Sequence, residues 1–400
     1  MGGLDPNRAI VHMDLDTFFV SVERKKDNRL NGKPLIIGGT GDRGVVSSCS
    51  YEARAFGVHS AMPIRLAKRL CPHAILISGD FEAYSEHSHM VSDIVKEASP
   101  LYEKASIDEF YIDLSGMERF FGSYLWARDL RNKVMDETGL PISFGLSVNK
   151  MVAKVATGEA KPNGHLQIVA PQVSGFLAPM PVQKIPLVGK KTAQSLTYLG
   201  VKTVSNLREI PRPVLERVYG KQGTLLYRRA RGEDDAPVIP YTEQKSMSTE
   251  STFSQDTIDI VKLRSVLTAM VEKLAFGLRK QRKLTACISV KLRYANFETF
   301  TRQARIPYTA NDDVLIDKAL HLFTRLYDRR IRVRLVGVRL SHLVPGGMQI
   351  DLFQDQVRQV DLFQALDGIK RKYGGSSIGK ASGIYGGKRA LRREDYTGEL

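Results

Sequence analysis

The segment Ala9-Ile-Val-His-Met-Asp-Leu-Asp16 decides the fold of the N-terminal part of the chain. Apolar and polar residues alternate along it, as they do in a strand with one buried face. It ends in two acidic residues. A second apolar segment, residues 105–114, is also expected to form a strand and carries Asp108 and Glu109. If these two strands are neighbours, their carboxylates converge.

The residues around this segment predict a mixed arrangement of helices and strands. Further strands are expected over residues 35–38, 44–49 and 142–148, and helices over residues 18–26 and 149–160. Lys161-Pro-Asn-Gly164 should stop the second helix, because proline and glycine do not continue it. Since no regular βαβ repeat is present, we expect an α+β fold.

The rest of the chain predicts at least two further parts. Residues 172–236 resemble short basic helices, and the polar, proline-containing stretch from Gly232 to about Thr249 resembles a linker. A small domain is expected next, with helices over 261–281 and 312–327 and alternating strands over 288–294, 331–335 and 338–341. After Pro345 the chain is expected to be a mobile tail, glycine-rich from Gly374 on.

Bulk composition narrows the function classes. The 400 residues are 42% hydrophobic, enough for two to four units with real cores. No apolar run approaches the roughly 18 residues of a membrane span, and the N-terminus has no secretory pattern. The three cysteines are far apart, without metal-site spacing. We therefore expect a cytoplasmic protein without a zinc site, a disulfide framework or a membrane partner.

Positive charge is unevenly distributed along the chain. The net charge is +16, from 59 Lys and Arg against 43 Asp and Glu. The first 170 residues are nearly balanced, so the excess lies almost wholly after them. A basic surface of this kind suits a polyanion held by phosphate contacts, which favours nucleic acid over a merely basic soluble protein.

The acidic clusters suggest a chemistry. Hard Mg²⁺ ions take oxygen ligands, and two of them about 3.5–4 Å apart can stabilise both the attacking and the leaving oxygen of a phosphoryl displacement. Asp14, Asp108 and Glu109 could hold such a pair, although solvated acids at strand ends give the same pattern. Tyr51, Arg54 and Lys161 add groups that grip triphosphate oxygens, and together these residues favour a magnesium–triphosphate site.

Five ordered motifs resemble the Y-family DNA polymerases of the bacterial DNA polymerase IV type, over roughly residues 8–345. They are Met13-Asp-Leu-Asp-Thr-Phe-Phe19, Ser50-Tyr-Glu-Ala-Arg-Ala-Phe-Gly57, Ser106-Ile-Asp-Glu109, Phe144-Gly-Leu-Ser-Val-Asn-Lys150 and Ala160-Lys-Pro-Asn-Gly164. The resemblance implies a right-hand polymerase. Its parts would be a palm (1–17 and 82–170), fingers (18–81), a thumb (171–236), a linker (237–249), a little finger (250–343) and a mobile tail (344–400).

The resemblance also implies roles for individual residues. Asp14 and Asp108 would bridge two Mg²⁺ ions, Glu109 would bind the ion at the primer 3′-hydroxyl, and the Leu15 carbonyl would complete the other. The phosphates of the nucleotide would be held by Tyr51, Arg54, Lys161, the Ser48 hydroxyl and the backbone at Phe18. Asp16 is spaced like a metal ligand, but its counterpart in the family is structural.

Selectivity and fidelity follow from further positions. Phe19 occupies the steric-gate position, where a ring under the sugar leaves no room for a 2′-hydroxyl; a core aromatic is the alternative. Val45 and Ser47 would form a small, open roof over the templating base. With no stretch left for a proofreading exonuclease, we expect low fidelity and tolerance of damaged templates.

Two basic regions are expected to hold DNA. The segment from Ile185 to Val201 resembles a helix-hairpin-helix, in which backbone N–H groups at a helix start meet a phosphate. Its contacts would be Gly189, Lys190, Lys191 and Thr192, although Leu187 stands where a first glycine is common. In the C-terminal domain, alternation predicts one basic strand face carrying Lys291, Arg293, Arg332 and Arg334.

A short peptide occurs twice in the C-terminal region, as Gln349-Ile-Asp-Leu-Phe353 and Gln359-Val-Asp-Leu-Phe363. The first copy resembles the bacterial clamp-binding peptide, and Gln349, Asp351, Leu352 and Phe353 are its candidate contacts. The second copy continues at helical spacing, so a short amphipathic helix is the stronger interpretation there.

The sequence therefore predicts a monomeric, template-directed DNA polymerase that uses deoxynucleoside triphosphates on primed DNA and is recruited by a sliding clamp. A catalytically idle DNA- and clamp-binding scaffold is the alternative, against which the intact acidic trio argues. A cyclase built on a similar palm would leave the hairpin, the basic domain and the clamp peptide unexplained.

Overall fold

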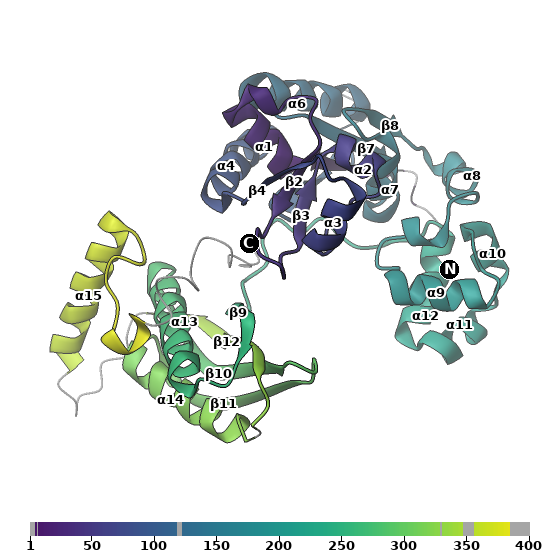
Figure 1. Cartoon of the computed structure of the whole chain (residues 1–400). Coiled ribbons are helices and arrows are strands. Elements are labelled where there is room, and N and C mark those ends of the chain that lie inside the picture. The colour runs from purple at the N-terminus through teal and green to yellow at the C-terminus, as the bar shows by residue number, and fades with distance from the viewer. Residues whose placement is uncertain (1–4, 6, 118–121, 329, 347–355, 385–400) are drawn as a thin grey trace. The chain divides into compact units, whose positions relative to one another are not determined.

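The computed structural model describes residues 5, 7–117, 122–328, 330–346 and 356–384. The chain divides into two compact units, one of residues 1–38 with 45–242 and one of residues 39–44 with 243–400. The mixed α+β class expected from the sequence is confirmed in both units, each of which combines a sheet with helices (Figure 1).

The first unit is built on a five-stranded sheet in the order β5-β6-β1-β7-β8. Its strands are β1 Ile10–Leu15, β5 Tyr102–Lys104, β6 Glu109–Asp113, β7 Ile142–Ser147 and β8 His165–Gln167. The helices that accompany it are α1 Phe18–Lys26, α4 Phe81–Ala98, α6 Ser123–Thr138 and α7 Lys150–Ala160. The strand expected over 105–114 begins later, at Glu109, because Asp108 lies in a turn before β6. The Ser106 hydroxyl holds this turn by accepting hydrogen bonds from the amides of Asp108 and Glu109.

The two faces of β1 meet different helices. Val11, Met13 and Leu15 join the core that contains the apolar residues of α4 and α6. His12 faces α7, where it contacts Thr157. Since side chains alternate along a strand, Asp14 projects from the same face as His12. Local capping fixes α7 in place, because the Asn149 side chain accepts a hydrogen bond from the Val152 amide.

A three-stranded sheet in the order β3-β2-β4 forms the part expected to be fingers. It consists of β2 Leu35–Gly38, β3 Val46–Cys49 and β4 Ile75–Ile77, with α2 Tyr51–Ala55, α3 Ile64–Leu70 and the 3-10 turn η1 Asn28–Leu30 beside it. Helix α2 begins directly after β3, because Ser50 caps it by accepting from the Ala53 amide.

Short helices follow in the region expected to be the thumb. Those of residues 190–198, 204–209, 212–219 and 221–230 gather in one cluster (Figure 1). The elements are η2 Ala170–Gln172, α8 Val173–Leu177, η3 Val182–Lys184, α9 Lys190–Tyr198, α10 Val204–Glu209, α11 Arg212–Tyr219 and α12 Lys221–Ala230. They share a small core that includes Leu196, Leu207, Leu215 and Leu226.

The second unit is a four-stranded antiparallel sheet, ordered β11-β10-β12-β9, with helices packed on it. Its elements are β9 Ser246–Thr257, α13 Ile260–Lys280, β10 Lys283–Tyr294, β11 Thr299–Thr309, α14 Asp312–Leu326 and β12 Val333–Pro345. The linker expected to reach Thr249 is shorter, since Ser246–Thr249 pair with β12. An edge strand needs only one neighbour and little burial, so its polar start looks like a linker in sequence.

A bulge interrupts one predicted strand face. Val333 and Leu335 are both buried, as the alternation predicted, but the pairing of β10 with β12 slips between Arg293 and Tyr294. Tyr294 therefore faces Val333, while Arg293 faces Leu335. A bulge adds one residue and reverses the alternation beyond it. Leu335 lies outside the apolar core that contains Val333 and Val336.

The region after Pro345 is not wholly a mobile tail, which corrects that expectation. Helix α15 spans Gln356–Tyr373, and the short helix η4 spans Ala381–Gly383. Asp367 of α15 makes a two-pronged ion pair with Arg279 of α13, and the Lys380 amide donates to Glu272 of the same helix. The glycine-rich end from residue 385 on lies outside the described residues. None of the described helices is long and apolar enough to cross a membrane.

Candidate active site

Strand pairing brings the three candidate metal ligands together. In the register of β1 with β6, Asp14 lies directly opposite Glu109. The Leu15 amide donates a 3.0 Å hydrogen bond to the Asp108 carbonyl, which ties the turn before β6 to the end of β1. Each carboxylate influences the ionisation of Asp14. The convergence expected from two acidic segments is therefore present.

Asp108 is held by its own turn. The Ser106 hydroxyl donates to Asp108 Oδ1 at 2.6 Å and accepts from the Glu109 amide at 3.1 Å. Burial raises the pKa of Asp108, and the neighbouring Glu109 adds to that rise. The turn thus fixes a carboxylate whose charged form is disfavoured by burial.

Asp14 is paired with a lysine from the end of α7. Lys161 Nζ hydrogen-bonds to Asp14 Oδ1 and lies 3.6 Å from Asp16 Oδ1. Burial raises the pKa of Asp14 to about 7, in spite of Lys161 and with a further contribution from Asp108 and Glu109. Lys161, expected at the triphosphate, here compensates a carboxylate.

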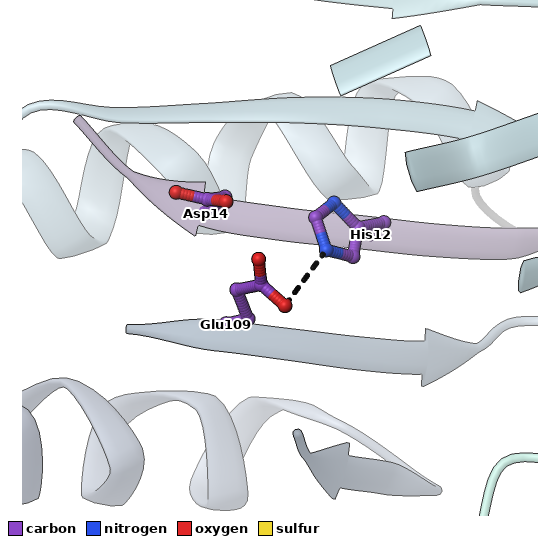
Figure 2. Close-up of side chains that lie close together, drawn as sticks. All are labelled: His12, Asp14 and Glu109. Carbon is purple, nitrogen blue, oxygen red and sulfur yellow. Dashed lines mark ion pairs between the residues drawn. The ribbon is translucent and has the colours of Figure 1, made fainter. Parts of the chain in front are cut away.

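Glu109 lies between a lysine and a histidine. Lys154 Nζ is 2.6 Å from both Glu109 oxygens. His12 Nε2 is 3.8 Å from Oε2, the contact that is dashed in Figure 2. Burial opposes ionisation of Glu109, but Lys154 outweighs it and lowers its pKa. Burial lowers the pKa of His12 to about 4, against the pull of Glu109, so the ring is neutral at physiological pH.

Asp16 is consumed by structural contacts, in agreement with the role that the resemblance implied. It is almost fully buried. Its Oδ2 accepts from the Ser143 hydroxyl at 2.8 Å and from the Asn163 amide at 2.6 Å. Tyr51 donates to its other oxygen at 3.3 Å. Asp16 therefore ties β1 to β7 and to the Lys161–Gly164 turn.

The candidate phosphate-binding residues gather at two short helices beside this cluster. Tyr51 and Arg54 lie on α2, with the guanidinium 5.1 Å from the centre of the phenol ring. Burial raises the pKa of Tyr51, and nearby Asp16 raises it further. Helix α1 begins at Phe18, just after the acidic end of β1. Amide groups at a helix start carry partial positive charge toward an anion.

Phe19 has a fixed ring in a partly apolar setting. It stacks on Tyr84 with ring centres 4.2 Å apart and planes 11° apart, and meets the edge of Phe81. It lies at the border of the core rather than within it. Val45 and Ser47, the expected roof residues, are exposed. Ser48, an expected phosphate contact, is half-buried in β3. Their exposure is compatible with an open site.

The hairpin before α9 resembles the expected helix-hairpin-helix start. Gly189 is the N-terminal cap residue of α9, and Lys190, Lys191 and Thr192 form its first turn. Leu187 has φ +70° and is 74% exposed. That backbone conformation favours glycine. The turn keeps the geometry of a glycine hairpin although a leucine occupies the first position.

The basic strand residues of the second unit are partly engaged with neighbours. Lys291 pairs with Glu250 at 2.6 Å, and Arg293 donates to the Thr299 hydroxyl at 2.8 Å. The Arg334 guanidinium lies 4.5 Å from the centre of the Phe297 ring. Arg332 is exposed. The slip in β12 separates Arg334 from the alternation that was expected to align it with Lys291.

The two copies of the clamp-type peptide differ in the structure. The first copy, with Gln349, Asp351, Leu352 and Phe353, lies outside the described residues. The second copy lies in α15, where Phe363 is 4% exposed and packs beneath the Arg279 guanidinium. The helical interpretation of the second copy is confirmed.

Sequence reasoning missed His12 and Lys154, which both lie against Glu109. His12 precedes Asp14 by two residues, and that spacing on a strand puts both on one face. Lys154 stands four residues after Lys150 on α7, hence on the same helix face. Both signals exist in the sequence, but only the packing of α7 on β1 gives them a common target.

A carboxylate cluster on a mixed sheet, beside a three-stranded fingers part and a helical thumb, defines the class as right-hand nucleotide polymerases. Family models support this. The impB/mucB/samB family matches residues 13–158, its C-terminal domain residues 244–352, and the DNA polymerase-iota thumb domain residues 183–234.

Individual relatives agree with the family models. A DNA polymerase IV of Dehalococcoides mccartyi is 39% identical over 93% of this chain and 96% of its own length. A DNA polymerase IV of Streptococcus agalactiae is 37% identical over 85% of this chain and 95% of its own. A solved Y-family DNA polymerase chimera of Dbh and Dpo4 superposes with a TM-score of 0.75 at 25% identity, covering 84% of this chain and 100% of its own.

The chain belongs to the Y-family of translesion DNA polymerases, of the DNA polymerase IV type. It is therefore a DNA-directed DNA polymerase whose partners are DNA and deoxynucleoside triphosphates and whose activity depends on divalent metal ions. The right-hand architecture expected from the sequence is confirmed.

Proposed function

We propose that this polymerase adds deoxynucleotides to a primer 3′-end with two Mg²⁺ ions held by Asp14, Asp108, Glu109 and the Leu15 carbonyl. The observation that carries this proposal is the register of β1 with β6, which sets Asp14 opposite Glu109 next to the Asp108 turn. Three acidic side chains from two segments 94 positions apart thus converge where divalent cations can replace the ammonium groups that accompany Asp14 and Glu109.

The donor set fits magnesium. All proposed ligands are oxygens, which Mg²⁺ prefers. The ammonium groups of Lys161 and Lys154 contact Asp14 and Glu109, so the cluster attracts positive charge. When bound, the two Mg²⁺ ions would supply electrostatic stabilisation to both the attacking and the leaving oxygen of the phosphoryl transfer. Lys161 and Lys154 are 20% and 35% exposed in their side chains and can yield their places to ions.

We further propose that Tyr51, Arg54, Lys161 and the Ser48 hydroxyl hold the β- and γ-phosphates, together with the amide at Phe18. Arg54 is exposed, and its guanidinium can bind two phosphate oxygens at once. Lys161 would exchange Asp14 for a phosphate once cations neutralise the carboxylate. Phe19 would lie under the sugar and exclude ribonucleotides.

Low fidelity without proofreading, tolerance of damaged templates and cytoplasmic action as a monomer complete the proposal. Val45 and Ser47 would cover the templating base with little bulk. Gly189, Lys190, Lys191 and Thr192 would hold one DNA backbone, and Lys291, Arg293, Arg332 and Arg334 would contact another stretch. The peptide Gln349–Phe353 would bind the sliding clamp.

Asp108→Asn tests the metal assignment, because it removes one charge without changing size. We expect Mg²⁺-dependent primer extension to fall by at least about a thousandfold, a loss typical of a group that stabilises transition-state charge. Binding of primed template should stay within about twofold, since the cluster is not a phosphate-contacting surface. Single-turnover extension and fluorescence anisotropy measure the two quantities.

The matched control is Glu97→Gln, which removes one carboxylate charge from the exposed end of α4. It should extend primers like the unchanged protein. Extension by Asp108→Asn at a rate similar to that of the control would reject the metal assignment. Loss of template binding along with activity would point to misfolding rather than chemistry, and thermal unfolding distinguishes the two.

A further inference from the structure

The buried imidazole of His12 has an unusual environment. Its side chain is 1% exposed, yet Nε2 has no hydrogen-bond partner among the described residues. Glu109 Oε2 lies 3.8 Å away, too far for a hydrogen bond. A buried polar nitrogen without a partner costs roughly 1–3 kcal/mol, so its position calls for a ligand.

The nitrogen points into a group of possible metal ligands. One atom each from His12, Asp14 and Glu109 lies within 4.8 Å of the others, and Figure 2 shows the ring and both carboxylates turned toward a shared space. Donors around a transition-metal ion with bonds of about 2.0–2.2 Å lie roughly 3.3 Å apart. The side chains would close by up to about 1.5 Å, and Asp14 and Glu109 are both partly exposed.

The other ring nitrogen already has the partner that a metal-binding histidine needs. His12 Nδ1 lies 2.8 Å from Thr157 Oγ1, and that hydroxyl also lies 2.9 Å from the Ala153 carbonyl. The Thr157 hydroxyl can therefore accept a hydrogen bond from the Nδ1–H group while it donates one to the Ala153 carbonyl. Nε2 then carries the free lone pair, and a hydrogen bond at the far nitrogen is what orients most metal-ligating histidines.

Close packing of α7 on the sheet supports this arrangement. His12 is paired in register with Gly145 of β7. A Cβ at Gly145 would stand 2.3 Å from the Ala153 carbonyl oxygen and 2.5 Å from the Thr157 amide. Glycine is therefore required for α7 to lie this near β1, which places Thr157 within reach of the imidazole.

We propose that His12, Asp14 and Glu109 form a nitrogen-containing site for a first-row divalent transition-metal ion. The site uses two of the carboxylates proposed for Mg²⁺ but not Asp108, and it adds an imidazole that Mg²⁺ does not favour. The ion would displace the Lys154 ammonium from Glu109. Because the carboxylates are shared, filling this site excludes the proposed primer-side Mg²⁺ ion.

Cobalt binding tests the site without DNA, nucleotide or magnesium. Co²⁺ titrated into the full-length protein should give visible absorption bands that saturate at one ion. His12→Gln should raise the dissociation constant for Co²⁺ by at least about tenfold, since losing even an outer partner of a metal ligand lowers metal affinity 10- to 100-fold. Asp108→Asn should bind Co²⁺ within about twofold of the unchanged protein. Equal affinity in His12→Gln and the unchanged protein would overturn the proposal.

A second pair of variants keeps the test decisive if His12→Gln does not fold. Thr157→Val removes the hydroxyl at nearly constant volume and should lower Co²⁺ affinity about tenfold, whereas Thr157→Ser keeps it and should not. Equal affinity in this pair would also reject the proposal. The Co²⁺ titration does not depend on primer extension. Tight Co²⁺ binding by a protein that fails in a separate primer-extension assay would reject the Mg²⁺ mechanism and leave this site standing.

Discussion

At the scale of single residues, the active site is decided by which charge neighbours each carboxylate. Asp14 and Asp108 are half-buried with raised pKa values, whereas Glu109 has a lowered one because Lys154 accompanies it. Burial thus disfavours the charged form of two carboxyl groups, whereas the Lys154 ammonium favours the charged form of the third. The differences depend on the neighbours rather than on residue type.

Phe19 gives a prediction at this scale. Its ring is held by Tyr84 in a parallel stack 4.2 Å away, which fixes the surface proposed to lie under the sugar. Phe19→Ala should raise the ratio of ribonucleotide to deoxynucleotide insertion by roughly tenfold to a hundredfold, the range expected when a pocket loses a steric contact. Phe19→Tyr, which keeps the ring, should discriminate like the unchanged protein. Steady-state insertion kinetics with both sugars measure the ratio, and an unchanged ratio in Phe19→Ala would refute the gate.

At the scale of elements, the backbone of the thumb hairpin separates stability from binding. Gly189 has space around it: a Cβ there would meet nothing within 4 Å, and its φ of −76° suits any residue. Leu187, in contrast, carries the left-handed φ. Folding alone therefore does not require glycine at position 189, although a phosphate against the helix start would.

Gly189→Ala tests that separation. We expect the free energy of unfolding to fall by about 1 kcal/mol or less, since glycine is preferred to alanine at a helix N-cap. Affinity for primed DNA should fall severalfold, because the added methyl group would stand between the amides of α9 and a phosphate. Chemical denaturation and anisotropy titrations give the two numbers. DNA affinity equal to that of the unchanged protein would exclude the hairpin as a phosphate contact.

The docked helix α15 makes a second prediction for an element. Arg279 pairs with Asp312 at 2.6 Å and with Asp367 at 2.8 Å, and its side chain is only 11% exposed. Arg279→Met leaves two buried carboxylates without their partner and should destabilise the second unit by about 3–5 kcal/mol. Asp367→Asn leaves the pair with Asp312 and should cost less. Denaturant unfolding compares them, and a milder effect of Arg279→Met would contradict the predicted order.

Sequence periodicity predicted the interior elements well, because the buried face of a strand or helix requires apolar residues at a regular spacing. β1, β7, α7 and α14 lie within about one residue of the expected ranges. Edge strand β9 was not predicted, and α15 was predicted only around the second peptide copy, since the contacts of both elements come from distant parts of the chain. The slip in β12 could not be seen either, because a bulge changes the register without changing composition.

The candidate site was predictable to a different depth. Ordered motifs identified Asp14, Asp108 and Glu109, and the structure brings these residues together. His12 and Lys154 escaped because histidine on a strand and lysine on a helix are common without function. Their role depends on the distance between α7 and β6, which is set by tertiary packing and cannot be predicted from the residues next to each of them.

At the scale of the whole molecule, function is divided along the chain as charge is. The first 170 residues, which carry the carboxylate cluster, are nearly neutral, and the basic excess lies in the parts proposed to hold DNA. A polymerase that grips its template mainly through phosphate contacts dissociates readily at physiological salt. Such an enzyme gains most from a tether, which the proposed clamp peptide would supply.

The two peptide copies make the last prediction, because burial distinguishes residues that the sequence makes equivalent. Phe363 is 4% exposed under Arg279, so the second copy cannot present its aromatic anchor while α15 is docked. Replacing both Leu352 and Phe353 with Ala should therefore abolish stimulation by the clamp while sparing synthesis on a bare primer. The matched control is Leu362→Ala, whose side chain is 55% exposed on α15 and whose loss should leave both activities intact. Primer extension with and without clamp measures the difference. If stimulation survives the double replacement and falls in Leu362→Ala, α15 itself must undock to bind, and the first copy is a spacer.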